Sequence, residues 1–208
     1  VVIGSGVNNA NTLARVNITT GTLNIGSNLV FNTSNNANRE LTAVLDMTGG
    51  NGRVNLSGQL TFINNRGLLL SGTSGSVFNY NRSSGGQTIM FPTANSTPWT
   101  YHNLYLNNTG TGVNLFGGIS ASNVTGDVRV QSGTFYVGNA AIVGNASRTF
   151  QVVPGATFRM EGNQPFPTGF GTFDLGTTTP FGTVIYQQSN DQNIANHTYG
   201  NLILRRNG

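Results

Sequence analysis

Strand-like alternation is clearest in the run VNITTGTLNIG, residues 16–26, where apolar residues alternate with polar ones on both sides of a glycine. The run recurs as VRVQSGTFYVG at residues 128–138. Alternation with a period of two predicts strands with one buried face, and the central glycine predicts a turn between them. Similar short runs, separated by Gly, Asn, Ser and Thr, continue along the chain. We therefore expect an all-β fold without long helices.

A second pattern also occurs twice, as G-[ST]-V-x-(x)-Y followed by Q-x-I and then by Y-x-N-L-x-L. Its residues are Val77, Tyr80, Gln87, Tyr101, Asn103, Leu104 and Leu106 in the first copy, and Val184, Tyr186, Gln192, Tyr199, Asn201, Leu202 and Leu204 in the second. Both patterns keep the same order in each half of the chain. We predict two repeat units, residues 1–109 and 110–208, and interpret the chain as part of a longer tandem array.

Composition favours one all-β architecture, the parallel β-helix, over a string of β-sandwich domains. The chain contains 30 Asn and 26 Thr, and only 8% of its residues are charged. Equivalent positions of a β-helix stack on one another, so Asn and Thr can form ladders of like side chains, whereas like charges would repel. We expect about eight or nine coils of roughly 20–25 residues, with right-handed crossovers.

The alternation also predicts which side chains fill the bore of the helix, with Asn, Thr and Ser placed outside and at the turns. The predicted bore residues are Val16, Ile18, Leu23, Ile25, Val77, Leu104, Leu106, Val128, Val130, Val184, Leu202 and Leu204.

The sequence argues against an enzyme. It has no Cys, no Lys, two His and six scattered acids, so neither a catalytic triad nor paired carboxylates nor a Cys-ligated metal is indicated. We predict no catalytic residue, no metal site and no cofactor, and we place His102 and His197 on the surface near turns. Ten dispersed Arg do not indicate nucleic-acid binding, and no apolar run is long enough to indicate membrane insertion.

Aromatic residues are the strongest candidates for a binding surface. Trp99, Tyr101 and Tyr105 share one strand parity and could present a row of rings that stacks on sugars. The alternative is that these rings pack against the solenoid or beneath the Pro-containing loop that precedes them.

The two repeated patterns resemble those of very large secreted surface proteins of Bacteroidetes, including gliding-motility adhesins, and of filamentous haemagglutinin-like β-solenoids. The resemblance implies an extracellular or cell-surface array and brings no catalytic residues. We accordingly expect a non-enzymatic structural component of an extracellular filament, stalk or surface adhesin, whose partners are neighbouring repeat units end to end. The alternatives are a glycan- or surface-binding module with an aromatic face, and a self-assembling filament subunit.

Overall fold

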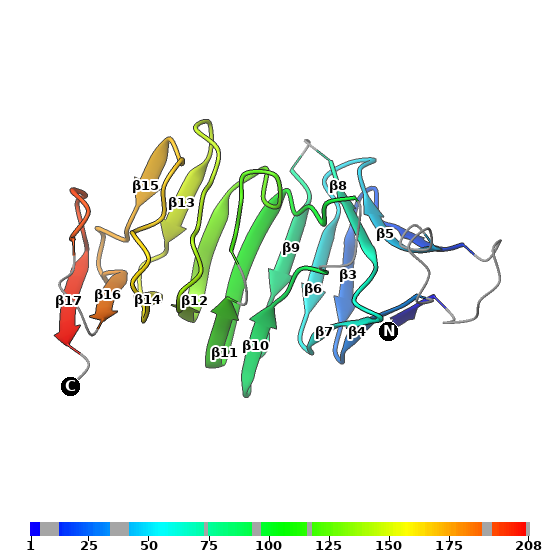
Figure 1. Ribbon diagram of the computed structural model, residues 1–208, viewed down its shortest axis with the longest axis horizontal. Coiled ribbons are helices and arrows are strands. Elements are labelled where there is room, and N and C mark those ends of the chain that lie inside the picture. The colour runs from blue at the N-terminus through cyan, green and yellow to red at the C-terminus, as the bar shows by residue number, and fades with distance from the viewer. Residues whose placement is uncertain are drawn as a thin grey trace.

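The chain folds as a parallel β-helix, in which short strands coil around a hydrophobic bore (Figure 1). The structure, a computed structural model, describes residues 1–4, 13–33, 42–72, 75–92, 97–115, 118–188 and 193–206. Every strand pairing within those residues is parallel. The predicted fold is therefore confirmed, because stacked sandwich domains would consist of antiparallel sheets.

Seven of the described strands stack in register to form one wall, here called the first ladder. They are β3 (Thr22–Ile25), β6 (Arg53–Leu56), β9 (Val77–Tyr80), the start of β11 (Asn103–Leu115), the start of β12 (Val128–Val137), β13 (Thr149–Val152) and β15 (Thr172–Asp174). One column of inward side chains follows this ladder: Leu23, Val54, Phe78, Leu104, Val128, Phe150 and Phe173.

A second ladder continues from the first around a corner, because β11 and β12 are long enough to belong to both walls. It contains β10 (Gly86–Ile89), the ends of β11 and β12, β14 (Thr157–Met160), β16 (Thr183–Gln188) and β17 (Asn201–Arg206). Its inward column is Gln87, Val113, Phe135, Phe158, Val184 and Leu202. The pairing shifts register where β11 turns the corner.

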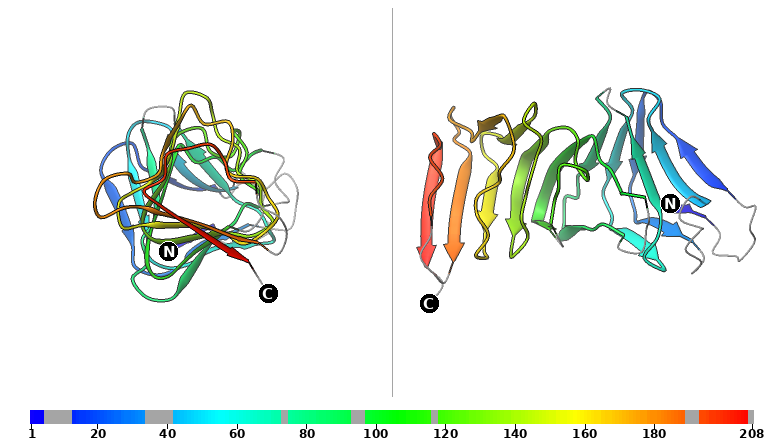
Figure 2. Two further views of the ribbon diagram at one scale, coloured as in Figure 1. Left: turned by 90° about the vertical axis from the view of Figure 1, so that its left-hand side faces the viewer. Right: turned by 45° about the horizontal axis from the view of Figure 1, so that its top comes forward.

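Two three-stranded sheets complete the walls near the N-terminus. One contains β1 (Val2–Ile3), β4 (Leu29–Asn32) and β7 (Leu60–Ile63). The other contains β2 (Ala14–Asn17), β5 (Ala43–Met47) and β8 (Leu68–Ser71). A view along the stack shows the chain winding repeatedly around a common centre (Figure 2).

The coils vary in length more than the sequence predicts. Paired residues of successive coils are 31 positions apart between β3 and β6, 22 apart between β12 and β13, and 18 apart between β16 and β17. The differences fall in the connections between strands, where insertions cost little as long as the ladder register is kept.

Most predicted bore residues are buried, including Ile18, Ile25, Leu104, Leu106, Val128, Val130 and Val184. Val77 was placed wrongly, because it pairs with Arg53 and Asn103 on the outer face while Phe78 and Tyr80 point inward. The first copy of the motif has one more residue between its Val and its Tyr, so the Val changes sides. Leu202 and Leu204 face the bore side of β17 but are 40% and 59% exposed.

The two copies of each repeated pattern lie on different walls. Residues 16–26 run from β2 around a corner into the first ladder, whereas residues 128–138 run from the first ladder into the second. The Tyr motif likewise spans β9 and β11 in the first ladder and β16 and β17 in the second. β11 passes through the predicted junction at 109/110 without interruption. The division into two units stays a prediction from sequence. In the structure, the second copy of each motif lies one wall further around the solenoid than the first copy.

Candidate functional site

The predicted row of three surface rings does not form. Trp99 is 2% exposed, and its ring packs edge-on against Phe31 and Phe62 with centroids 5.0 and 4.8 Å away. Tyr101 is completely buried, and only Tyr105 lies on the outer face. Rings buried in the bore cannot stack on a sugar, so Trp99 and Tyr101 are core residues.

Strand parity fails at this point because no strand joins the three rings. Tyr101 forms an isolated bridge with Val124, and the chain then bends at His102 before β11 begins at Asn103. The bend reverses the inward and outward positions, so that Tyr105 alternates with the inward Leu104 and Leu106.

The Tyr motif instead places pairs of hydroxyl groups in and beside the bore. The hydroxyl oxygens of Tyr186 and Tyr199 are 3.0 Å apart, and Tyr199 also donates a hydrogen bond to the carbonyl oxygen of Ala195 at 2.7 Å. The first copy makes the same pair between Tyr80 and Tyr101, at 2.8 Å. Burial raises the pKa of each of Tyr80, Tyr101 and Tyr199, so these phenols stay neutral and act as structural hydrogen-bonding groups.

Gln87, another motif residue, faces the bore but has all its hydrogen-bonding capacity used. Its Nε2 donates to the carbonyl oxygens of Leu56 and Gly58, each at 2.7 Å. Its Oε1 accepts from the backbone N–H of Arg82 at 3.0 Å and from Nδ2 of Asn108 at 3.1 Å. This amide therefore ties three coils together. Gln192, its predicted counterpart, lies outside the described residues.

Asparagine side chains form a hydrogen-bonded row on the outer face of the first ladder. Nδ2 of Asn55 donates to Oδ1 of Asn24 at 2.8 Å, and Nδ2 of Asn79 donates to Oδ1 of Asn55 at 2.9 Å. This arrangement of like residues confirms the expectation drawn from composition. In register, the same outer row continues through Tyr105, Arg129, Gln151 and Asp174.

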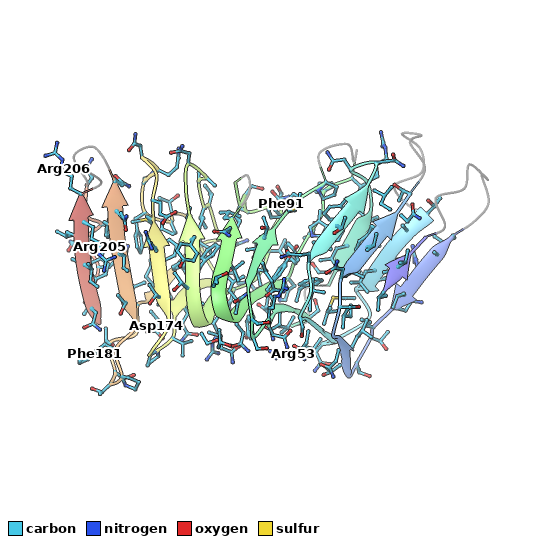
Figure 3. The ribbon with its side chains drawn as sticks, turned by 90° about the horizontal axis from the view of Figure 1, so that it is seen from below. Arg53, Phe91, Asp174, Phe181, Arg205 and Arg206 are labelled. Atoms are coloured by element: carbon cyan, nitrogen blue, oxygen red, sulfur yellow. The ribbon has the colours of Figure 1, made fainter. Side chains whose placement is uncertain are left out.

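Two arginines flank Tyr105: Arg129 follows it on this row, whereas Arg53 reaches it from the position in register with Val77. The guanidinium carbons of Arg53 and Arg129 lie 5.4 and 5.7 Å from the centroid of the Tyr105 ring. Arg53 belongs to β6, two strands away across β9, and Arg129 belongs to the adjacent β12. Arg53 also donates from Nε to Oδ1 of Asn55 at 3.0 Å. Figure 3 places Arg53 at the side of the solenoid with its side chain outside the ribbon. The Tyr105 ring was predicted as a contact from the sequence, whereas neither arginine was.

The second ladder carries a similar but neutralised contact. The guanidinium carbon of Arg159 lies 5.4 Å from the Tyr136 ring centroid, and its Nη2 is 2.8 Å from Oε1 of Glu161. Beside it runs a row of small hydroxylated residues, Thr134, Thr157 and Thr183, which ends at Asn201. Tyr136 and Arg159 therefore provide an internal comparison for Tyr105 and its two arginines.

His102 is not a surface residue, contrary to the prediction, whereas His197 is partly exposed. His102 is 3% exposed, and its Nδ1 lies 3.3 Å from Oγ1 of Thr125. Burial and then the charge of Arg148 lower the pKa of the His102 imidazole, opposed in part by Asp127. His197 packs its ring on Phe173, with centroids 4.3 Å apart.

Groups that could bind a metal or anchor the chain in a bilayer are sparse in the described part of the chain. Within it, no cluster of three or more His, Cys, Asp or Glu side chains is positioned to hold a metal ion. Over the same residues, no helix has the length and apolarity needed to cross a membrane.

A shallow groove of about 440 Å³ lies near the C-terminal end of the stack. Its apolar floor includes Phe166, Phe173 and Ile194, and His197 forms part of one side.

Comparisons of the chain with protein families, with curated proteins and with solved structures find no match.

Proposed function

We propose that this chain is a non-enzymatic structural segment of an extracellular filament, stalk or surface adhesin. The observation that carries the proposal is the unbroken parallel pairing from β3 to β17, which passes from the first ladder to the second through β11 and β12. Strand hydrogen bonds in such a stack run along its long axis, so each coil is tied to the next over the length of the rod.

Side chains reinforce the same direction. The bore is filled by aromatic and aliphatic side chains and by the amide of Gln87, all of whose hydrogen-bonding groups have partners. On the outside, the hydrogen-bonded row of Asn24, Asn55 and Asn79 links three coils. A filament or stalk needs such contacts in every coil, because a pulling force on one coil passes to the next through many weak contacts.

End-to-end contact with neighbouring repeat units is supported by two apolar side chains of β17. Leu202 and Leu204 stand in register above Val184 and Tyr186, yet much of their surface is exposed. A further coil pairing with β17 would bury both side chains as the inner coils bury theirs. The extracellular location rests on the family resemblance, and the lack of Lys reduces the number of sites open to trypsin-like proteases.

The test is immunogold electron microscopy with an antibody raised against the 208-residue chain. On intact cells that produce the protein, we expect gold on surface fibres that show an axial repeat of about 4.8 Å. Gold seen only after permeabilisation, or only on compact particles, would overturn the proposal.

A further inference from the structure

The contact between Tyr105, Arg53 and Arg129 contains more positive charge than the fold needs. Within the described residues, neither arginine forms an ion pair. The only hydrogen bond from the side chain of Arg53 leaves from Nε, toward Asn55, and the side chain of Arg129 donates none to a described residue. Two guanidinium groups therefore meet at one partly exposed ring with most of their N–H donors uncommitted.

Acidic residues nearby are directed elsewhere. Asp127, two positions before Arg129, accepts a hydrogen bond from the backbone N–H of Thr149 at 2.9 Å. Asp174, at the far end of the same row, accepts one from Nε2 of Gln151 at 2.6 Å. The comparable arginine on the second ladder, Arg159, is instead paired directly with Glu161. The charge at Tyr105 is thus a local feature that the other Tyr–Arg contact lacks.

We propose that Arg53, Tyr105 and Arg129 form a binding site for an acidic polysaccharide, one whose sugars carry carboxylate or sulfate groups. Guanidinium groups recognise planar or tetrahedral oxyanions through paired N–H donors, and the Tyr105 ring, which both groups contact, holds them close together. This binding site does not depend on the filament role, because it concerns a ligand on the side of the solenoid and not the contacts between its coils.

The geometry favours an extended chain over a compact anion. The site lies within a straight row of side chains, spaced by about 4.8 Å per strand, that runs along the axis of the rod. Amides occupy the row on both sides of the charged contact, with Asn24, Asn55 and the buried Asn79 before it and Gln151 after it. Asn55 and Asn79 are tied into the asparagine hydrogen bonds, whereas Asn24 accepts but does not donate in them and Gln151 uses only its Nε2. Sugar hydroxyls can therefore pair with Asn24 and Gln151, and a linear polymer can continue past the two arginines in either direction.

The experiment measures binding of the whole chain to immobilised dextran sulfate and to polygalacturonate, with neutral dextran as the uncharged comparison. We expect binding to both acidic polymers, weakening as salt is added, and none to neutral dextran. Arg53→Gln and Arg129→Gln should each weaken binding by about tenfold to a hundredfold, the loss expected for a hydrogen bond to a charged group. Tyr105→Ala should weaken it as well.

The matched controls are Arg159→Gln and Tyr136→Ala, which alter the neutralised contact on the second ladder and should bind as the unmodified chain does. Arg129→Lys keeps the charge but loses the paired donors, and should fall between the unmodified chain and Arg129→Gln. Circular dichroism of each variant separates loss of binding from loss of fold. Equal binding by Arg53→Gln, Arg129→Gln and the controls would overturn the site. Binding to single-stranded DNA or phosphatidylglycerol vesicles with the same dependence on Arg53 and Arg129, without preference for the polysaccharides, would overturn the ligand class.

Discussion

The hydroxyl oxygens of Tyr80 and Tyr101 lie 2.8 Å apart at the centre of the bore, where both side chains are fully buried. Tyr80 ends β9 and Tyr101 lies near the end of the same turn, just before β11 stacks on β9, and the second copy of the motif repeats the contact with Tyr186 and Tyr199. This polar pair in an otherwise apolar bore fixes how the turn closes, because a shifted closure would leave both hydroxyls without a partner.

Removing both of these hydroxyls should cost less than the sum of removing each one alone. Tyr80→Phe leaves the Tyr101 hydroxyl buried without Tyr80 as a partner, and should lower the free energy of unfolding by about 1–3 kcal/mol. The double variant Tyr80→Phe/Tyr101→Phe should be less destabilised than the sum of the two single variants. Urea unfolding measures all three, with Tyr105→Phe as the outer-face control. Strict additivity would mean that the hydroxyls do not interact.

Alkaline pH should destabilise the protein through the same pair. Burial raises the pKa of Tyr80 and of Tyr101 above the usual value of about 10. The neutral phenols therefore stabilise the fold fully below pH 10, and their contribution is lost as pH rises through the interval up to the folded-state pKa values. Each group can remove up to about 1.4 kcal/mol per pH unit in this interval.

The measurement is the free energy of unfolding across the alkaline range, with tyrosinate absorbance followed in parallel. The Tyr80→Phe/Tyr101→Phe variant should show a flatter profile than the unmodified chain. An equally steep profile would assign the alkaline loss to other groups.

The sequence predicted the architecture well because its signals are local. Period-two alternation, glycine corners and an excess of stackable Asn and Thr are all readable within a few residues. It failed at Trp99 and Tyr101, because the bend at His102 that reverses strand parity leaves no mark in composition. The arginines at Tyr105 could not be found from sequence, since Arg53 is 52 positions away and reaches the ring only through the stacking of coils. The step of the repeated motifs from one wall to the next likewise depends on the lengths of the connections.

The glycine in each copy of the first motif should differ in importance. Gly21 and Gly133 both have a left-handed backbone, with φ of 81° and 66°. A Cβ on Gly21 would meet no atom within 4 Å, whereas one on Gly133 would overlap the carbonyl oxygen of Asn108. Gly21→Ala should therefore destabilise the protein by about 1–2 kcal/mol, from conformation alone, and Gly133→Ala by more.

Gly138→Ala is the matched control for this series, because a Cβ there also meets nothing and the backbone is not left-handed. It should change the free energy of unfolding by no more than about 0.5 kcal/mol. Thermal or urea unfolding of the three variants gives the order. If Gly133→Ala lowered the free energy of unfolding as little as Gly138→Ala, the backbone at the corner between the first and second ladders would have a conformation that accepts a Cβ at position 133.

Gln87 should be irreplaceable by an apolar residue of similar size. Gln87→Leu would remove the side-chain partner of the Gly58 carbonyl oxygen, of the Arg82 backbone N–H and of Asn108 Nδ2. The Leu56 carbonyl oxygen would keep only its hydrogen bond from the Asn81 backbone N–H. We expect a loss of about 3 kcal/mol or more, measured by urea unfolding. Gln151→Leu, which alters an amide on the outer row, should cost far less. A neutral Gln87→Leu would indicate that water can replace the amide.

Mechanical unfolding should proceed coil by coil. Force applied to the two ends loads the hydrogen bonds of the outermost rung first, because those bonds lie along the axis and the inner coils stay covered on both sides. Each rupture should release one coil, which ranges from the 18 residues between Thr183 and Asn201 to the 31 between Thr22 and Arg53. At the extended length of a residue, these are steps of about 60–110 Å. Single-molecule force spectroscopy, with reference domains of known length in the same chain, resolves such steps. One rupture that releases the whole chain would show that the coils fail together, and the rod would then transmit load as a single body rather than as a series of coils.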